Sequence, residues 1–458
     1  MAASDWAGSS SLRTRRANAL PTGTIATDGK LLGWLAGMLS QERHYQTVMA
    51  TLTASENYPS TAVRAAAAFV GGEHYFFDAP TPGHCGEWSF PRSGTLPALQ
   101  AKFLAQMKRL FAADIADWRP NGGSACEQAV VMAACKAGDA FVELAPEHGG
   151  HFGASVLAKR LGIQSFAFPM RSDLIDVERT AKLAKQHSNI RLALVQPSHC
   201  RRPQPIEELA AALPARVTIA VDVSHTAGLI AADLIPQPLQ HGAHILTFNT
   251  HKTLPGPNKG VIAFADRHHP LADAVWDVVC PQLQSNSHAE CLPGLVIALE
   301  EVANFGRAYA EQVIANARTL ARVLDRCGLT VPGMEYGGTQ THQVHVAIGA
   351  ADDSHKLANE VLPTCAFRTN SVMIPGTGGK FGLRLGTQAL TRRGLTAAGF
   401  AELGRLLVQA MRWSADAGRI REEVADLLAN HPLFPLRFSF DELDYGEHVG
   451  RLLTELLR

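Results

Sequence analysis

The chain lacks an excess of charge of either sign. Lysine and arginine together number 42, as do aspartate and glutamate, so the formal net charge is zero. A nucleic-acid-binding protein normally carries a basic excess, and this balance argues against a nucleic-acid partner. Long apolar runs are also missing. No stretch reaches the roughly 18 uncharged apolar residues of a membrane-spanning helix, so we expect no membrane span.

Paired cysteines are missing as well. The eight cysteines are scattered and form no Cys-x-x-Cys motif, which favours reduced thiols over a disulfide framework or a zinc site. Residues 1–30 hold serines and arginines, but no apolar segment typical of a secretory signal follows them. We therefore predict a flexible tail over 1–30, a cytoplasmic protein and no bound metal.

What the chain does have is the apolar content of an ordinary globular protein, 46% of 458 residues, and an alternation of short apolar runs with helical stretches. Apolar runs bounded by helices are typical of buried parallel strands in an α/β sheet. The predicted strands are 140–144, 165–168, 192–196, 217–223, 244–248 and 260–264. A long helical stretch over 296–324 then interrupts the rhythm, and a mixed pattern follows. We predict an N-terminal segment with a large α/β domain over 31–295, and a connecting helix with a small α+β domain over 296–458.

Three polar segments stand where an open α/β sheet binds its ligands. The first is Asn-Gly-Gly-Ser at 121–124, ahead of a helical stretch over 125–136. Backbone amides at a helix N-terminus, with the hydroxyl of Ser124, can hold a phosphate. Glu127 stands three residues after Ser124, so an ordinary capping box explains the same pattern.

The other two segments follow predicted strands. Asp222 ends a buried strand, where a carboxylate is costly unless it meets a positive partner; a structural aspartate that caps the next turn is the alternative. Lys252 follows the strand 244–248, where desolvation would lower its pKa and make its amine nucleophilic. A surface lysine in a loop is the commoner case.

Together the three segments match the needs of pyridoxal 5′-phosphate. A helix N-terminus holds the phosphate of this cofactor, an aspartate pairs with its pyridinium nitrogen, and a lysine forms the Schiff base. Each segment alone is ambiguous, but the set predicts a pyridoxal-phosphate enzyme.

The sequence also resembles the serine hydroxymethyltransferase-like branch of fold-type I pyridoxal-phosphate enzymes. The matching stretches are Thr-Ala-Ser-Glu-Asn at 53–57, Gly-Gly-His at 149–151, Asp-Val-Ser-His-Thr-Ala-Gly-Leu at 222–229, Thr-His-Lys-Thr-Leu at 250–254 and Leu-Arg-Leu-Gly-Thr at 383–387. The resemblance implies an aspartate aminotransferase-like large domain with a smaller C-terminal α+β domain, and a homodimer with shared active sites.

Within this branch the sequence is more similar still to the L-threonine transaldolases, such as that of obafluorin biosynthesis. Relatives in that group act on fluoroacetaldehyde or a uridine 5′-aldehyde. The shared stretches are Trp-Arg-Pro-Asn-Gly-Gly-Ser at 118–124, Gln-Ser-Asn-Ser-His-Ala-Glu at 284–290, Thr-Gln-Thr-His-Gln-Val-His at 339–345 and Thr-Arg-Arg-Gly at 391–394.

The resemblance implies a role for each matching residue. We expect His151 to stack on the ring of the cofactor and His225 to contact its 3-hydroxyl. The planar guanidinium of Arg384 suits two parallel hydrogen bonds to a carboxylate. The expected catalytic residues are Lys252, Asp222, His151 and Tyr75; the expected cofactor-binding residues are Gly123, Ser124, His151, Ser198, Asp222, His225, Thr250 and Lys252; and the expected ligands of the substrate carboxylate are Ser55 and Arg384.

Two departures from the hydroxymethyltransferases bear on the reaction. Those enzymes carry Tyr-x-Glu-Gly-Tyr, whose glutamate handles protons in the folate reaction, whereas this chain has Tyr-Phe-Phe-Asp-Ala at 75–79 with Phe77 at the glutamate position. Their glycine-rich loop, which reaches the phosphate in a neighbouring subunit, is replaced around 284–288. Folate-dependent transfer is therefore in doubt, while aldol cleavage is still possible.

The resemblance thus implies retro-aldol cleavage of L-threonine to acetaldehyde and a glycyl quinonoid, followed by aldol addition to an acceptor aldehyde. The product would be a β-hydroxy-α-amino acid, made in natural-product biosynthesis. The alternatives are a serine hydroxymethyltransferase or a threonine aldolase and, from another class, a non-catalytic cofactor-binding partner. The sequence does not identify the acceptor aldehyde.

Overall fold

The computed structural model describes residues 30–76, 94–412, 416–442, 450–451 and 454. The chain divides into two units, residues 1–46 and 47–458. Helix α1 (Lys30–Val48) begins the described part of the chain, and strand β1 (Ala50–Thr51) follows it. Residues 1–29 of the predicted tail lie outside the described residues, as does the segment that holds Phe77. Among the described helices, none combines the length and the apolar character that crossing a bilayer requires.

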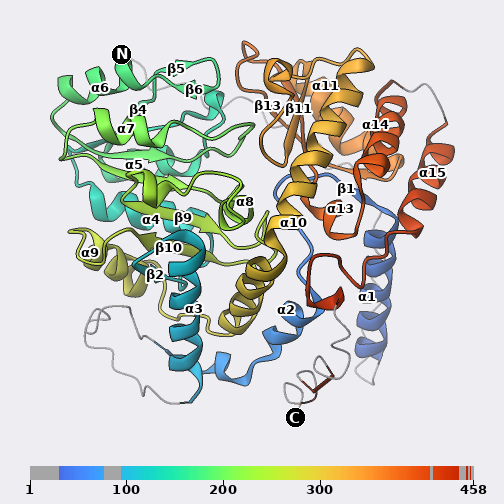
Figure 1. The fold of residues 1–458 in the computed structure, drawn as a ribbon, viewed down its shortest axis with the longest axis horizontal. Helices are drawn as coiled ribbons and strands as arrows, with labels where there is room; N and C mark the ends of the chain where they lie inside the picture. The colour runs from blue at the N-terminus through green and yellow to red at the C-terminus, as the bar shows by residue number, and fades with distance from the viewer. Residues whose placement is uncertain (1–29, 77–93, 413–415, 443–449, 452–453, 455–458) are drawn as a thin grey trace. The chain divides into compact units, whose positions relative to one another are not determined.

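A seven-stranded sheet organises the first half of the larger unit (Figure 1). The strand order is β2-β10-β9-β8-β7-β3-β4, and β3, β4, β7, β8 and β9 run parallel to one another. A separate hairpin pairs β5 with β6. The strands are β2 (Ile115–Asp117), β3 (Ala140–Glu143), β4 (Gln164–Ala167), β5 (Met170–Arg171), β6 (Leu174–Ile175), β7 (Ile190–Val195), β8 (Thr218–Asp222), β9 (Ile245–Asn249) and β10 (Gly260–Phe264).

The prediction of parallel pairing throughout the sheet is wrong for β10. This strand runs antiparallel to β9 and to β2. The loop 250–259 between β9 and β10 contains no helix, and a parallel connection needs a crossover of a dozen or more residues. The amide of Thr250 instead bonds to the carbonyl of Lys259 at 3.0 Å, which extends the hairpin beyond the strands.

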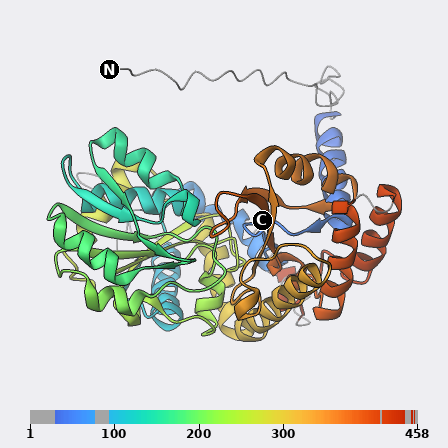
Figure 2. The same ribbon diagram turned by 90° about the horizontal axis from the view of Figure 1, so that it is seen from above.

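Helices cover both faces of this sheet (Figure 2). Alternate residues of β7 show the two layers. Leu192 and Leu194 pack with α4, α5 and α9, while Ala193 and Val195 pack with α3 and α10. The helices of this half are α2 (Thr61–Ala65), α3 (Leu96–Phe111), α4 (Gly123–Ala134), α5 (Gly153–Leu161), α6 (Val177–Gln186), α7 (Ile206–Ala212), α8 (Ala227–Ala231), α9 (Ala272–Asp277) and α10 (Cys291–Arg326).

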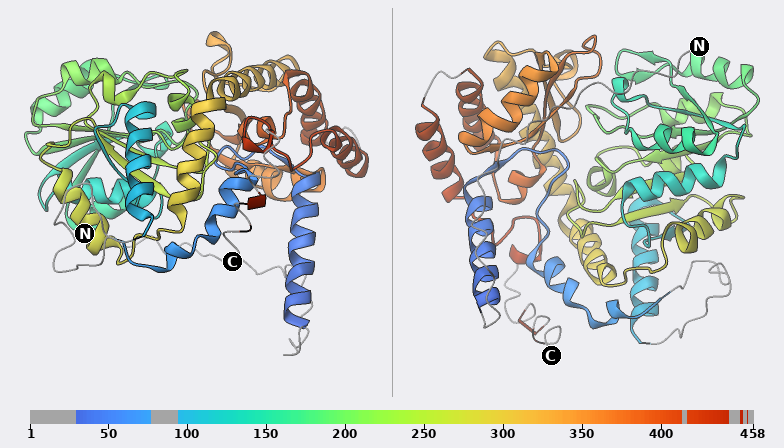
Figure 3. Two further views of the ribbon diagram at one scale, coloured as in Figure 1. Left: turned by 60° about the horizontal axis from the view of Figure 1, so that its bottom comes forward. Right: turned by 180° about the vertical axis from the view of Figure 1, so that it is seen from behind.

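A second core is built around the antiparallel sheet β11-β14-β13. Helix α10 contributes to both cores, through Leu292 to Val313 in the first and Ala317 to Leu324 in the second, and it lies beside α3 in Figure 3. The domain limits expected near residue 295 stay a prediction. The α-helices and strands of this half are β11 (Gln343–Gly349), α11 (Ala351–Lys356), α12 (Leu362–Thr364), β12 (Phe367–Arg368), β13 (Asn370–Met373), β14 (Phe381–Gly386), α13 (Gln388–Arg392), α14 (Ala397–Arg412) and α15 (Ala417–Ala429).

The segment after α1 belongs to this second core. β1 pairs in parallel with β12, and Thr53 forms an antiparallel bridge with Leu385 of β14. Met49, Ala50 and Leu52 are buried among the C-terminal apolar residues. The pairing brings the Thr-Ala-Ser-Glu-Asn stretch at 53–57 next to the strand that carries Arg384.

A fully buried ion pair fixes α10 to the C-terminal region. Arg392 Nη2 lies 3.0 Å from Glu301 Oε2, and the two side chains are 1% and 0% exposed. Glu301 Oε1 also accepts a hydrogen bond from the amide of Phe440 at 3.0 Å. Removing the charge on one member would leave the other uncompensated in the interior.

We predict that Glu301→Gln lowers the free energy of unfolding by about 3–5 kcal/mol, measured by urea denaturation. The matched control is Glu311→Gln on the same helix, which removes the exposed pair with Arg307 and should cost less than about 0.5 kcal/mol. Equal losses for the two variants would contradict the prediction.

Candidate active site

The carboxyl ends of the parallel strands and the start of α4 surround one cavity. The residues that line it come from five separate parts of the chain: Gly123, Ser124, Glu127, His151, Gln196, Ser198, Asp222, Ser224, His225, Asn249 and Lys252. The structure therefore brings together most of the side chains that the sequence singled out. Arg384 reaches the same place from β14 through Ser198, as described below.

Asp222 is the last residue of β8 and is only 6% exposed. Its Oδ1 accepts the amide of Ser224 at 2.9 Å, and its Oδ2 accepts the hydroxyls of Ser224 at 2.9 Å and Thr247 at 3.0 Å. All three donors are neutral, and no cation of the described residues lies within 4 Å of this carboxylate. The charge is held in position but not neutralised.

Lys252 follows β9 and faces the same cavity. Burial lowers the pKa of its amine to about 8, although the charge of Asp222 opposes the shift. No described residue accepts a hydrogen bond from its Nζ. Asn57 donates to the Lys252 carbonyl at 2.5 Å and anchors the backbone at this point. A half-buried amine with a lowered pKa has the deprotonated population that a nucleophile needs.

His151 is positioned by a tight turn. The amide of His151 bonds to the carbonyl of Gln196 at 3.2 Å, which ties it to the end of β7. A Cβ atom on Gly150 would lie 1.8 Å from the Leu144 carbonyl oxygen, so only glycine fits before the histidine.

His151 also bonds to a buried glutamate that the sequence had not assigned to the site. Its Nδ1 lies 2.9 Å from Oε2 of Glu127, a residue only 3% exposed. That hydrogen bond raises the pKa of His151, and burial raises the pKa of Glu127. The two groups are thus joined by one hydrogen bond, and the environment favours the protonated form of each. The capping-box interpretation of Glu127 is wrong, because α4 is capped by Gly122 without a side-chain bond.

The start of α4 is held by the end of β9. Asn249 Oδ1 accepts the amide of Gly123 at 2.7 Å, and the amide of Asn249 bonds to Ser224 Oγ at 2.9 Å. Gly123 is thus already bonded within the protein. The next first-turn amides have no partner inside the helix and remain available to an anion, together with the exposed hydroxyl of Ser124.

Arg384 enters from the second half of the chain. It is 7% exposed, its Nη1 donates to the carbonyl and hydroxyl of Ser198 at 3.1 and 3.3 Å, and its Nε is buried without a partner. Burial lowers the pKa of Arg384 to about 10. No described carboxylate forms an ion pair with this guanidinium, which suits it to a ligand that brings its own carboxylate.

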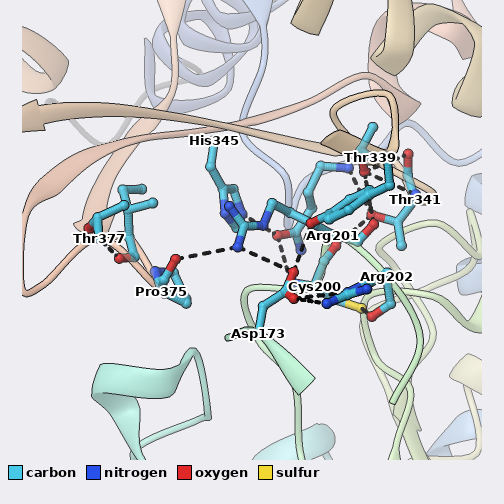
Figure 4. Close-up of polar contacts among 12 residues, drawn as sticks. Asp173, Cys200, Arg201, Arg202, Thr339, Thr341, His345, Pro375 and Thr377 are labelled. Carbon is cyan, nitrogen blue, oxygen red and sulfur yellow. Dashed lines mark hydrogen bonds and ion pairs between the residues drawn. The ribbon is translucent and has the colours of Figure 1, made fainter. Parts of the chain in front are cut away.

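The loop that carries Ser198 is attached to the second half by the Thr339–His345 stretch. Thr339 and Thr341 donate to the carbonyls of Arg201 and Cys200 at 3.2 and 2.5 Å, and Gln343 donates to the carbonyl of Ser198 at 3.1 Å. Figure 4 shows this junction, in which Arg201 and Arg202 also meet Asp173. Ser198 and Arg384 are thereby fixed relative to each other.

Four of the predicted site residues need separate description. Thr250, Tyr75 and Ser55 are not among the residues that line the cavity, whereas His225 is. Thr250 is fully buried, and its hydroxyl bonds to the Pro257 and Lys259 carbonyls of its own loop. Tyr75 is 44% exposed and does not line the cavity. Ser55 is half-buried two residues after the Thr53 bridge to β14. His225 lines the cavity, and its Nδ1 lies 3.5 Å from Nε2 of the buried His342.

Sequence reasoning missed Glu127, Gln196, Ser224 and Asn249 as lining residues. Ser224 and Asn249 lie inside segments that were singled out, so proximity to Asp222 and Lys252 was an available signal. Glu127 stands one turn into α4 from Gly123, on the side that faces His151. Nothing in the sequence separates that arrangement from an ordinary helix cap.

The chemistry of these groups fits pyridoxal phosphate. A buried carboxylate without a cation, an amine without an acceptor and an arginine with a buried, unpartnered Nε are each costly alone. The cofactor supplies a protonated ring nitrogen for Asp222 and an aldehyde for Lys252, and an amino-acid substrate supplies a carboxylate for Arg384. Free amides at the start of α4 suit the phosphate.

Comparisons with known proteins agree with this chemistry. The family model for serine hydroxymethyltransferase matches residues 33–407. The serine hydroxymethyltransferase of Cenarchaeum symbiosum (strain A) is 30% identical over 437 residues, which cover 91% of this chain and 97% of the relative. The serine hydroxymethyltransferase of Myxococcus xanthus (strain DK1622) is 30% identical over 419 residues, which cover 88% of this chain and 97% of that relative.

A solved structure is similar over nearly the whole chain. The crystal structure of L-threonine transaldolase from Pseudomonas fluorescens, in its internal aldimine state, superposes with a TM-score of 0.92 at 39% identity. The match covers 94% of this chain and 98% of that one. The resemblance to both groups is confirmed, as are the fold class and the cofactor. The chain belongs to the serine hydroxymethyltransferase family and is a pyridoxal-phosphate-dependent enzyme.

Proposed function

We propose that this enzyme is an L-threonine transaldolase. It cleaves L-threonine between Cα and Cβ, releases acetaldehyde and joins the remaining glycine unit to an acceptor aldehyde. The product is a β-hydroxy-α-amino acid, and we place the reaction in natural-product biosynthesis. The observation that carries the proposal is the near-complete match to an L-threonine transaldolase at 39% identity, against 30% for the hydroxymethyltransferases.

Three of the stretches shared with the transaldolases line the cavity or contact segments that line it, which supports the proposal. Gln284 donates to the carbonyl of Arg119 at 2.9 Å, so the 284–290 and 118–124 stretches touch. The 339–345 stretch holds Ser198 and Cys200 through Gln343, whose Oε1 accepts the Cys200 amide at 3.1 Å. Of these stretches, 118–124 contributes Gly123 and Ser124 to the cavity lining, and the other two contact segments that carry lining residues.

Bound pyridoxal phosphate accepts the electron pair that is left at Cα when the Cα–Cβ bond breaks. Asp222 serves this chemistry by keeping the ring nitrogen protonated, since a carboxylate without another cation stabilises a positive charge there. Lys252 holds the cofactor covalently between turnovers, and its lowered pKa favours that bond. Arg384 and Ser55 bind the amino-acid carboxylate, and Ser198, which accepts hydrogen bonds from Arg384, contacts the cofactor.

A proton must leave the β-hydroxyl of threonine as the bond breaks, and one must return to the new hydroxyl after addition. We assign this proton to the pair of His151 Nδ1 and Glu127 Oε2. The two groups lie 2.9 Å apart and both have raised pKa values. A hydrogen-bonded pair of this kind can take up a proton and give it back without a change in fold.

The alternative is a serine hydroxymethyltransferase or a threonine aldolase, and the names of the curated relatives favour it. Phe77 at the position of the folate-handling glutamate argues against the first of these.

We also propose a homodimer in which the exposed Tyr75 acts in the cavity of the partner, since it does not line the cavity of its own chain.

We predict that Arg384→Lys raises the KM for L-threonine at least about tenfold while preserving the charge. Lysine cannot make two parallel bonds to a carboxylate, and about 1.5–3 kcal/mol is lost per charged hydrogen bond. Steady-state kinetics check this, with Arg368→Lys as the matched control. Arg368 forms an exposed ion pair with Glu56, so the KM of the Arg368→Lys variant for L-threonine should equal that of wild type. A wild-type KM in Arg384→Lys would remove this residue from the substrate site.

The reaction itself is tested by mass spectrometry with L-threonine and a panel of aldehydes, without folate. We expect acetaldehyde and a new β-hydroxy-α-amino acid to form in equal amounts. Serine should be a poorer donor, although the extra methyl of threonine is worth only about 1 kcal/mol. Rapid turnover of serine with tetrahydrofolate, together with release of free glycine from threonine in the presence of aldehydes, would establish the alternative.

A further inference from the structure

A second buried lysine does not line the cavity but bonds to Asn121, just ahead of α4. Lys259 is 2% exposed and stands at the end of the loop that also carries Lys252. Its backbone is fixed by Thr250, whose amide bonds to the Lys259 carbonyl at 3.0 Å and whose hydroxyl accepts the Lys259 amide at 3.1 Å. The contacts that Thr250 makes therefore set the position of Lys259.

The amine of Lys259 has neutral partners. Its Nζ donates to the carbonyl of Ser287 at 3.0 Å and to Oδ1 of Asn121 at 3.3 Å, and it lies 6.0 Å from the ring centre of Trp118. No carboxylate of the described residues lies within 4 Å. Burial lowers the pKa of Lys259, even though Glu290 and Asp117 oppose the shift. Such a buried charge is costly unless a bound anion balances it.

The partner Asn121 connects this lysine with the start of α4. It directly precedes Gly122 and Gly123, where that helix begins. Since Lys259 bonds to Oδ1, the carboxamide is held with its NH2 group free to donate elsewhere. The carbonyl of Pro120 accepts the amide of Gly260 at 2.9 Å, so the backbones of the two segments are also joined. Lys259, Asn121 and the first turn of α4 thus form one connected unit.

We propose that Lys259 supplies the positive charge that balances the phosphate of the cofactor, and that it acts by holding Asn121 toward that phosphate. A phosphate monoester carries between one and two negative charges near pH 7, which the neutral amides of α4 stabilise but do not cancel. Lys259 is therefore a positioning residue for cofactor binding. The inference rests on the cofactor alone and is independent of the amino-acid donor and of the acceptor.

The test compares two ligands of the apoenzyme that differ only in the phosphate, pyridoxal 5′-phosphate and pyridoxal. Affinities are measured by fluorescence titration for wild type and for Lys259→Met. We expect the preference for the phosphorylated ligand to fall about tenfold or more in the variant, with the affinity for pyridoxal within about threefold of wild type. Lys182→Met, an exposed lysine on α6, is the matched control and should keep the wild-type preference.

A second variant and a second readout keep the proposal testable if Lys259→Met fails to fold. Asn121→Asp retains an acceptor for Lys259 but brings a negative charge to the phosphate, so it should also reduce the preference. In 31P NMR, the pKa of the bound phosphate should be higher in both variants than in wild type. Equal losses of affinity for the two ligands, or an unchanged preference, would show that Lys259 only ties Ser287 to Asn121 and would overturn the proposal.

Discussion

Buried charges without a nearby opposite charge are the constraint around which this site is built. Asp222 has three neutral hydrogen-bond donors, Arg384 keeps an unpartnered Nε, and the half-buried Lys252 has no hydrogen-bond acceptor among the described residues. A folded protein retains such groups at a cost in stability, which a ligand with complementary charges repays on binding. The cofactor and an amino acid supply these charges together.

The fold delivers the three groups from separate elements. Asp222 ends β8 and Lys252 follows β9, and these adjacent parallel strands have their carboxyl ends at one edge of the sheet. Arg384 comes from the second, antiparallel sheet. Its distance from Asp222 and Lys252 would change if the two halves moved independently. The hydrogen bonds from Gln343 and Thr341 to the Ser198–Cys200 segment restrict that motion. The substrate carboxylate is thus held at a fixed place relative to the ring.

Local patterns predicted much of this arrangement and failed where long-range packing decides. The strands that end at Asp222 and before Lys252 could be predicted because apolar runs of β-type length are distinctive. The antiparallel direction of β10 was missed, since periodicity does not record strand direction. The sequence offered a helix cap as the role of Glu127, and its actual partner is His151, which a distant turn brings to it. Thr250 stands beside Lys252 in the sequence, yet its hydroxyl points into its own loop.

The central claim is that the buried carboxylate of Asp222 lacks a positive partner until the cofactor binds and supplies its protonated ring nitrogen. The test uses the Asp222→Asn variant. Its melting temperature is measured by differential scanning calorimetry with and without pyridoxal phosphate, and its affinity for the cofactor is measured as well. The account predicts that the apoenzyme of the variant melts at or above the wild-type temperature, because a buried charge has been removed. The rise in melting temperature on adding cofactor should shrink, and turnover should fall sharply. An apoenzyme that is less stable than wild type, with unchanged cofactor affinity and turnover, would contradict the account and leave Asp222 a structural residue.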